Sequence, residues 1–479
     1  MQLSEAAGEF IRGRWRDDIV GRLTDYIRVP AKSPAFDPDW AAHGYLDRVV
    51  REARDWAVTQ KITGFEIEIV SLPQRTPCIF FKAPARGGAG SDGTVLFYGH
   101  LDKQPEMTGW REGFGPWQPV LENGRLYGRG AADDGYAVYA ALTAIGALDA
   151  SATSRPTCVG LIETCEESGS YDLPAYLDAL RPRMGNIGLL IALDSGCGDY
   201  ERLWTTTSLR GMASGLLTVE VLSEGVHSGS ASGVVPSSFR IQRLLLDRLE
   251  DARTGEIRDP MFQAAIPAER QSQARAAGAV LGDRTWKQFP FAPSAGKSKG
   301  STQPMSADPV QAILNRTWKP TLSVIGAAGL PAPKEAGNVL RPKTALKLSV
   351  RLAPTTDSER ASARLQEILE ADPPYGARVT FEPDHAADGW NAPLTASWLE
   401  DSLREASQAA YGKEPVAMGE GGTIPFIAML GKKFPDVQFV ITGVLGPQSN
   451  AHGPNEFLDI GYATKLTQAI AQVVATARV

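Results

Sequence analysis

The sequence predicts an α/β protein in which a doubly wound, mostly parallel sheet is interrupted by a smaller inserted domain with two α/β layers. Three observations lead to this fold class. Apolar strands alternate with helical segments in the first part of the chain, alternating strands and amphipathic helices follow, and the first pattern then returns. The predicted domains are 1–207 and 387–479 for the larger, catalytic domain and 208–386 for the insertion.

The larger domain begins with helical apolar spacing and continues with apolar strands. In order, we expect helices at 4–29 and 40–60, strands at 65–70, 78–83 and 94–100, a helix at 136–148, a strand at 157–164, a helix at 171–180 and a strand at 187–196. Strands that are apolar almost throughout are typical of a sheet covered by helices on both faces. After residue 387 a helix, the glycine-rich turn GEGGTIPF and a strand at 437–444 complete this domain.

The inserted domain has alternating strands and amphipathic helices. We expect strands at 216–223, 347–354 and 377–383 and helices at 234–251 and 359–371. This β-α-β…β-α-β order is typical of a ferredoxin-like domain. Residues 284–309 are rich in Pro, Ser, Gly and Lys and predict a long loop within it.

Composition narrows the function classes. The net charge of −6 disfavours nucleic acid and anionic membranes as partners. No apolar run approaches the roughly 18 residues of a membrane helix, and the N-terminus does not have the apolar core of a secretory signal. The four cysteines form no CxxC pair, so we expect a cytoplasmic protein with free thiols.

Polar residues follow several of the predicted buried strands. His100 ends one strand, Glu166 and Glu167 follow another, and Asp194 follows a third. In doubly wound sheets ligands bind beyond the carboxyl ends of the strands, so these side chains are expected at one rim. Carboxylates near a core are costly unless a cation or hydrogen bonds compensate them.

Each of these residues also has an ordinary explanation when taken alone. His100 resembles a strand-end histidine paired with Asp102, Asp133 a helix cap, the Glu166–Glu167 pair a solvated loop, and His452 a surface loop residue. Together they fit a pair of metal ions. The three carboxylates of Asp133, Glu167 and Asp194 and a bridging hydroxide balance the charge of two divalent cations. Mixed His and carboxylate ligands suit Zn²⁺, with Mn²⁺ or Co²⁺ as alternatives.

The motifs GHLD, GRGAADDG, CEESGS, the aspartate after an apolar strand and NAHGPNE resemble the di-zinc metallopeptidases of clan MH. This family includes cytosolic and carnosine dipeptidases, aminoacylases and glutamate carboxypeptidase. The resemblance, which extends over nearly the whole chain, implies that His100, Asp133 and Asp194 hold one zinc ion. It implies that Asp133, Glu167 and His452 hold the other, that Glu166 is the general base and acid, and that Asp102 orients His100. The family often has a cis peptide after the bridging aspartate, which here is the Asp133–Asp134 bond.

The inserted domain resembles the lid and dimerisation domain of the same family, so a homodimer is expected. The resemblance implies that His227 stabilises the oxyanion, in dimeric members from the neighbouring subunit, and that Asn338 and Arg351 contact substrate. His385 and Thr423 resemble positions that hold the carboxylate end of the substrate in the dipeptidase branch. Alternatively, Arg351 is an ordinary surface charge of a strand and Thr423 only serves its turn. One departure is Gly135, which stands where the family usually has lysine and leaves the packing beside Asp133 open.

The resulting hypothesis is an amide hydrolase for dipeptides or short peptides with a free carboxylate, acting through a bridging hydroxide on a di-zinc centre. The first alternative is an N-acyl-amino-acid deacylase on the same scaffold. From other classes, a zinc-dependent binding protein without catalysis is disfavoured because Glu166 and His227 are both present. A structural zinc protein is disfavoured because such sites are often rich in cysteine. The sequence leaves the substrate side chain, the native metal and the role of 284–309 open.

Overall fold

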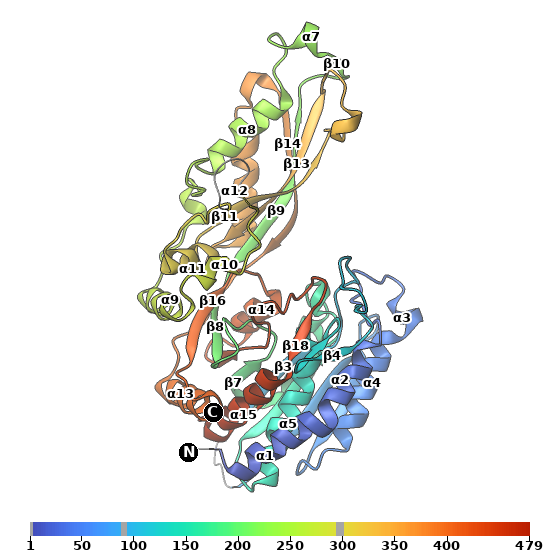
Figure 1. The fold of residues 1–479 in the computed structure, drawn as a ribbon, viewed down its shortest axis with the longest axis vertical. Helices are drawn as coiled ribbons and strands as arrows, with labels where there is room; N and C mark the ends of the chain where they lie inside the picture. Colours follow the sequence, from blue (N-terminus) through green and yellow to red (C-terminus); the bar gives the residue numbers. More distant parts are fainter. Residues whose placement is uncertain (1–2, 88–92, 294–300) are drawn as a thin grey trace. The chain divides into compact units, whose positions relative to one another are not determined.

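The computed structural model describes residues 3–87, 93–293 and 301–479 (Figure 1). By its internal contacts the chain divides into two compact units. Unit 1 consists of Met1–Thr207, Ala392–Met418 and Met429–Val479, and unit 2 consists of Ser208–Asn391 and Gly419–Ala428. The segment Gly419–Ala428, which the sequence places in the larger domain, packs with unit 2. It does so because Arg210 Nε donates to Gly421 O and Thr423 Oγ1 donates to Arg210 O.

Unit 1 is built on a six-stranded sheet in the order β1-β2-β6-β3-β7-β17. The strands are β1 (Glu66–Val70), β2 (Cys78–Ala83), β3 (Gly93–His100), β6 (Thr157–Glu163), β7 (Asn186–Ala192) and β17 (Gln438–Ile441). Neighbours from β6 to β17 pair in parallel, whereas β2 is antiparallel to both β1 and β6. The predicted mostly parallel sheet is therefore confirmed, with an antiparallel edge.

Helices surround this sheet, and the most buried of them leads directly from the predicted aspartate turn. Every residue of α5 (Tyr136–Ala150) except the last is buried, because the helix packs against α1 (Glu5–Arg14) and α15 (Ile460–Thr476) as well as β3 (Figure 1). The other long helices of unit 1 are α2 (Val20–Ile27), α4 (Tyr45–Val58), α6 (Leu173–Met184) and α13 (Ser397–Tyr411). Helix α14 (Pro425–Lys433) begins in unit 2 and ends in unit 1.

Two predicted helices differ in detail from the observed ones. Within the predicted helix at 4–29, residues 5–27 form a continuous helical path through α1, the wider turn η1 (Trp15–Ile19) and α2. The predicted helix at 40–60 is divided at Gly44, whose φ of +68° ends α3 (Trp40–His43) before α4 begins. Glycine adopts this left-handed conformation without the steric penalty of a Cβ.

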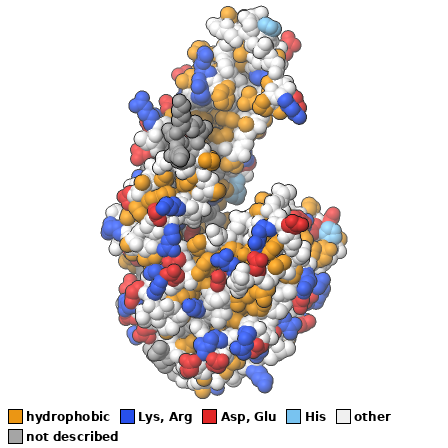
Figure 2. Space-filling model, viewed as in Figure 1, with side chains coloured by type: hydrophobic (Ala, Val, Ile, Leu, Met, Phe, Trp, Pro, Cys, Tyr) orange, Lys and Arg blue, Asp and Glu red, His pale blue; other side chains and the backbone are white. Residues whose placement is uncertain are grey.

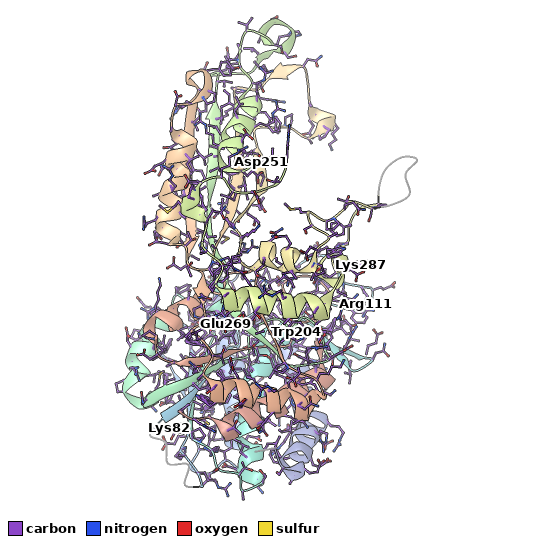
Figure 3. All side chains as sticks on the ribbon, turned by 90° about the vertical axis from the view of Figure 1, so that its left-hand side faces the viewer. Lys82, Arg111, Trp204, Asp251, Glu269 and Lys287 are labelled. Atoms are coloured by element: carbon purple, nitrogen blue, oxygen red, sulfur yellow. The ribbon has the colours of Figure 1, made fainter. Side chains whose placement is uncertain are left out.

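Two further three-stranded sheets lie in unit 1 and at its boundaries. A three-stranded sheet has the order β18-β5-β4, from β4 (Val120–Glu122), β5 (Arg125–Tyr127) and β18 (Phe457–Asp459). A second has the order β15-β8-β16, from β15 (Trp390–Asn391), β8 (Trp204–Leu209) and β16 (Val416–Glu420), and both β8 and β16 continue from one unit into the other. Trp204, labelled in Figure 3, is buried and donates from Nε1 to Asp199 at 3.0 Å.

Unit 2 has a four-stranded antiparallel sheet in the order β11-β13-β9-β14. Its main elements are β9 (Gly211–Glu220), α8 (Ser238–Leu249), β11 (Thr321–Ala328), β13 (Lys343–Leu352), α12 (Ser358–Glu370) and β14 (Arg378–Ala387). Apolar residues of α8 and α12 pack with those of the sheet in one core, including Leu217, Leu245 and Leu365. The order β-α-β-β-α-β with this strand arrangement is ferredoxin-like, as the sequence predicts.

Unit 2 also contains elements that the sequence analysis did not predict. Helices α9 (Ala268–Leu281), α10 (Arg284–Lys287) and α11 (Pro309–Thr317) precede β11, and Figure 3 labels Glu269 in α9 and Lys287 in α10. The predicted loop at 284–309 is therefore interrupted by α10 at its start, and its part at 294–300 lies outside the described residues. The short strands β10 (Val226–His227), β12 (Val339–Leu340) and β15 (Trp390–Asn391) and the short helix α7 (Ser228–Ala231) are also present.

The surface has a mixed charge distribution. Acidic and basic side chains are interspersed over the visible face of unit 1 (Figure 2). This distribution agrees with the small net charge of −6. Within the ranges that the structure describes, none of the helices combines the length and hydropathy needed to cross a membrane.

Candidate metal centre

The sheet of unit 1 brings three of the predicted polar segments to one edge. Strands β3, β6 and β7 are parallel neighbours, and His100 at the end of β3 lies in register with Glu163 at the end of β6. Glu166 and Glu167 follow β6, and Asp194 follows β7. The carboxyl ends of parallel strands share one edge of a sheet, so these side chains converge there.

His100, Asp133 and Asp194 form the first group that could hold a metal ion. His100 Nε2 lies 3.3 Å from Asp133 Oδ1 and 3.7 Å from Asp194 Oδ2. All three residues are buried, and His100 is fully so. Asp133 reaches the group from the turn before α5, where the Asp133–Asp134 peptide bond is cis.

Asp133, Glu167 and His452 form the second group, so Asp133 is common to both. His452 Nε2 lies 3.0 Å from Asp133 Oδ2 and 3.3 Å from Glu167 Oε2. Asp133 thus directs one oxygen towards each histidine. His452 comes from the loop between β17 and β18, and its side chain is 55% exposed, whereas that of Glu167 is 3% exposed.

The electrostatics of this cluster favour a cation. Burial, together with the charge of Asp194, raises the pKa of Glu166, and burial together with Asp133 raises that of Glu167. Burial also raises the pKa of Asp194 to about 6. Divalent cations among these carboxylates would relieve the repulsion and the cost of burial.

Two buried polar atoms point to the same conclusion. His100 Nε2 and Glu167 Oε1 have no hydrogen-bond partner among the described residues. A buried donor or acceptor without a partner is unfavourable. His100 Nε2 belongs to the first group and Glu167 Oε1 to the second, and each atom would gain a partner if it were a metal ligand. The donor set of imidazole nitrogens and carboxylate oxygens therefore fits a metal ion in both groups.

Asp102 supports the centre in two ways. Its backbone carbonyl lies 3.1 Å from His100 Nδ1, which places the proton on Nδ1 and leaves Nε2 for a metal. Its carboxylate accepts hydrogen bonds from the backbone N–H groups of Glu166 and Glu167, at 3.2 Å and 3.0 Å. One residue therefore fixes both the histidine and the loop that carries the two glutamates.

Glu166 lies beside the two groups without belonging to either. Its Oε2 is 4.0 Å from His100 Nε2, and its side chain is 12% exposed. A carboxylate in this position can exchange a proton with a water molecule held between the groups.

Gly135 has a steric explanation. A Cβ at this position would lie 2.3 Å from Tyr26 Cε1 and 2.8 Å from Gly130 O, so the lysine that the family usually has would not fit. A different lysine contacts the same tyrosine. Lys103 is fully buried, lies with Nζ 3.7 Å from the Tyr26 ring centroid, and donates to the carbonyls of Tyr26 and Val29 at 2.7 Å and 2.8 Å.

The predicted substrate residues lie in unit 2, where the segments of His227 and Asn338 adjoin each other and Arg351 contacts Thr423. His227 on β10 and Asn338 beside β12 are both exposed, and Ser228 N donates to Asn338 O at 2.9 Å. Arg351 Nη1 donates to Thr423 Oγ1 at 2.9 Å. His385 is exposed on β14 opposite Ser214 of β9, and the described contacts do not join it to the other four.

Three residues with clear roles were missed by the sequence analysis. Arg210 holds the loop of Thr423, while Arg129 and Glu456 form a fully buried ion pair in unit 1. Arg129 stands within GRGAADDG and Glu456 within NAHGPNE, so both motifs contained the signal. An arginine or a glutamate in a loop is usually solvated, which is why these two were not singled out.

The model of peptidase family M20/M25/M40 matches residues 96–476. The chain belongs to this family. This membership confirms the predicted metallopeptidase class and a metal cofactor, and the matched range includes every residue of the two candidate metal groups as well as Asp102 and Glu166.

Curated relatives of this chain and a similar solved structure agree with the predicted dipeptidase-like branch of the family. The chain is 26% identical over 419 residues to the cysteinylglycine-S-conjugate dipeptidase of Corynebacterium striatum, covering 85% of this chain and 86% of that protein. It is 27% identical over 474 residues to the Cys-Gly metallodipeptidase DUG1 of Saccharomyces cerevisiae, covering 93% and 92%. The structure of the Saccharomyces cerevisiae di-peptidase Dug1p superposes with a TM-score of 0.73 at 22% identity, covering 99% of both chains, and confirms the fold.

Proposed function

We propose that this member of family M20/M25/M40 is a dipeptidase that hydrolyses the amide bond of dipeptides with a free carboxylate. The observation that carries the proposal is the shared Asp133, which directs its two carboxylate oxygens towards His100 and His452 in two adjacent groups of potential ligands. Relatives over most of the chain are named as dipeptidases, which supports the same substrate class.

The metal is proposed to be zinc, with two ions per chain. His100, Asp133 and Asp194 would hold one ion, and Asp133, Glu167 and His452 the other. When bound, paired ions of this kind polarise a carbonyl and lower the pKa of a coordinated water to about 7. Mn²⁺ and Co²⁺ remain alternatives because they accept the same ligands.

Glu166 is the proposed general base and acid. Its carboxylate takes a proton from the attacking water and gives it to the leaving amine, as its position beside both groups allows. Asp102 acts indirectly, because its hydrogen bonds hold His100 and the backbone of Glu166 and Glu167.

Substrate recognition is proposed for unit 2. Arg351 is held at Nη1 by Thr423, and no carboxylate is within ion-pair distance of it among the described residues. Its guanidinium is therefore available for the carboxylate of a substrate in a bidentate pair. His227 is proposed to stabilise the oxyanion, and Asn338, His385 and Thr423 to contact the substrate, as the family resemblance implies.

A homodimer through unit 2 and a cytoplasmic location stay predictions. Strand β11 is an edge strand of the ferredoxin-like sheet, and its residues from Ser323 to Ala328 are exposed. The exposed apolar residues Val324 and Ile325 on this edge support association through it.

The experiment that tests the function uses the variant Glu166→Ala and a substrate panel. Purified protein is assayed with dipeptides and with N-acetyl amino acids, with and without added Zn²⁺. We expect metal-dependent cleavage of dipeptides by the wild type and loss of turnover with unchanged metal content in Glu166→Ala. Turnover by this variant would refute the base assignment, and preference for N-acetyl amino acids would favour the deacylase alternative.

A further inference from the structure

The two histidines of the centre are oriented in different ways. His100 is fully buried, and its Nδ1 is fixed by the carbonyl of Asp102. His452 is half exposed, and no hydrogen bond to its Nδ1 is found among the described residues. Because metal-binding histidines are usually oriented through their second ring nitrogen, the position of the His452 ring must depend on its backbone.

The backbone around His452 adopts an unusual conformation. Gln448, Asn450, His452 and Asn455 all have positive φ, between 55° and 67°. Non-glycine residues adopt this region only where surrounding contacts hold them. The loop therefore needs an anchor close to His452.

Arg129 provides this anchor. Its Nη2 donates to the carbonyls of His452 and Gly453 at 3.0 Å and 2.9 Å. Its Nη1 donates to Glu456, and the two side chains are 1% and 0% exposed. Its Nε donates to Pro105 O at 3.2 Å.

Glu456 extends the connection to the aspartate turn. Its second carboxylate oxygen accepts a hydrogen bond from Gly130 N at 2.9 Å, three residues before Asp133. The buried pair thus joins the segments that carry Asp102, Asp133 and His452. A broken buried ion pair leaves an uncompensated charge, so these contacts persist only when both residues are present.

We propose that the buried Arg129–Glu456 pair is a positioning device that holds His452 at the second metal group. Neither residue belongs to either of the two groups of potential metal ligands. This inference rests on the proposed two-ion centre. It assigns the pair an effect on the ion at Asp133, Glu167 and His452, because Arg129 contacts the backbone of His452. The described contacts of Arg129 do not include His100 or Asp194.

The chain offers a matched control in a second buried ion pair of unit 1. Arg155 donates to Asp149 from Nε and Nη2 and to the carbonyls of Ala83 and Pro84 from Nη1. Like Arg129, it is buried and joins a carboxylate to backbone carbonyls. Its hydrogen bonds and ion pairs among the described residues include none with the residues of either metal group, so Arg155→Met measures the effect of losing a buried arginine alone.

The test compares full-length wild type, Arg129→Met and Arg155→Met, each loaded with Zn²⁺. Elemental analysis counts the ions, and competition with a chromophoric chelator gives their dissociation constants. We expect two ions in all three proteins when Zn²⁺ is in excess. In Arg129→Met the dissociation constant of one ion should rise by about 10–100-fold, as found when supporting partners of metal ligands are removed. Arg155→Met should bind both ions as the wild type does, although its melting temperature falls.

A second background identifies the affected ion. His452→Ala should lose the same ion, so adding Arg129→Met to it should change the affinity of the remaining ion by less than about threefold. If Arg129→Met does not fold, as judged by circular dichroism, Glu456→Gln decides by the same criterion, since it removes the charge of the pair but keeps the shape of the side chain.

The inference is overturned if Arg129→Met binds both ions with wild-type affinity. It is also overturned if Arg155→Met weakens metal binding as much as Arg129→Met does, because general destabilisation would then explain the loss. A wild-type protein with fewer than two ions would instead refute the proposed two-ion centre, and the inference with it.

Discussion

Replacing Gly135 by alanine adds one methyl group beside the Asp133–Asp134 turn. Gly135 has ordinary helical angles, φ −53° and ψ −25°, so alanine introduces no backbone strain of its own. The conflict is purely steric, because the new Cβ would lie 2.3 Å from Tyr26 Cε1 and 2.8 Å from Gly130 O. Non-bonded carbons prefer about 3.5–4.0 Å, so Tyr26 or the turn would have to move by more than about 1 Å.

The size of the effect follows from the surroundings of Tyr26. Its ring is buried, its hydroxyl donates to Leu101 O at 3.1 Å, and Lys103 Nζ lies over the ring. These contacts restrict movement of the Tyr26 ring away from the added methyl group. Overpacking of a protein core typically costs about 1–3 kcal/mol of stability. At about 2–4 °C per kcal/mol for a large domain, Gly135→Ala should lower the melting temperature by about 2–12 °C.

Thermal unfolding of the metal-loaded protein, followed by circular dichroism, measures this change. Gly21→Ala is the matched control, since Gly21 lies in α2 and a Cβ there meets no atom within 4 Å. This control should leave the melting temperature unchanged or raise it, because alanine is the better helix former by about 1 kcal/mol. If Gly135→Ala unfolds within about 1 °C of the wild type, the steric reason for the missing lysine is wrong.

Two further predictions concern substrate binding and pH. Arg351→Met should lower kcat/KM for dipeptides about 10–100-fold, since hydrogen bonds to a charged group contribute about 1.5–3 kcal/mol. The control Arg258→Met, at an exposed arginine, should leave kcat/KM unchanged. Both values come from steady-state kinetics, and wild-type activity of Arg351→Met would show that Arg351 does not bind the carboxylate. Burial alone would raise the pKa of Asp149, but hydrogen bonds from Arg155 and Thr63 lower it below its ordinary value. A carboxyl whose folded-state pKa is lowered stabilises the fold above its unfolded pKa, near 4, and this contribution is lost as the pH falls below that value. Urea unfolding between pH 6 and pH 3 should therefore show a smaller loss of stability on acidification for Asp149→Asn than for the wild type; parallel curves would contradict this assignment.

The fold could be predicted because its signals are local. Apolar strands such as 94–100 and 187–196 and the alternating strands of unit 2 determine the sheet types through their periodicity. The division of 40–60 at Gly44 was missed because a single glycine inside a helical pattern is often tolerated. The segment Gly419–Ala428 was placed with the larger domain because its contacts with Arg210 join residues far apart in the chain, and periodicity does not report such contacts.

The candidate site was predictable as a set of residues but not as a geometry. His100, Asp133 and His452 stand in short motifs whose residue types suit metal binding, and the strand ends indicate a common edge. The sequence does not reveal that Asp102 holds His100 through its carbonyl and the glutamates through its carboxylate. Nor does it reveal that Tyr26 occupies the space beside Gly135, since that contact depends on the packing of α2 against the turn.

Native mass spectrometry of the wild type and of Asp133→Ala, each purified without chelator, tests the central claim most directly. If Asp133 contributes to both groups, the wild type should carry two divalent ions per chain, and Asp133→Ala should lose affinity for both of them together. A wild type with a single ion, or a variant that keeps one ion at full affinity, would contradict the shared-carboxylate centre.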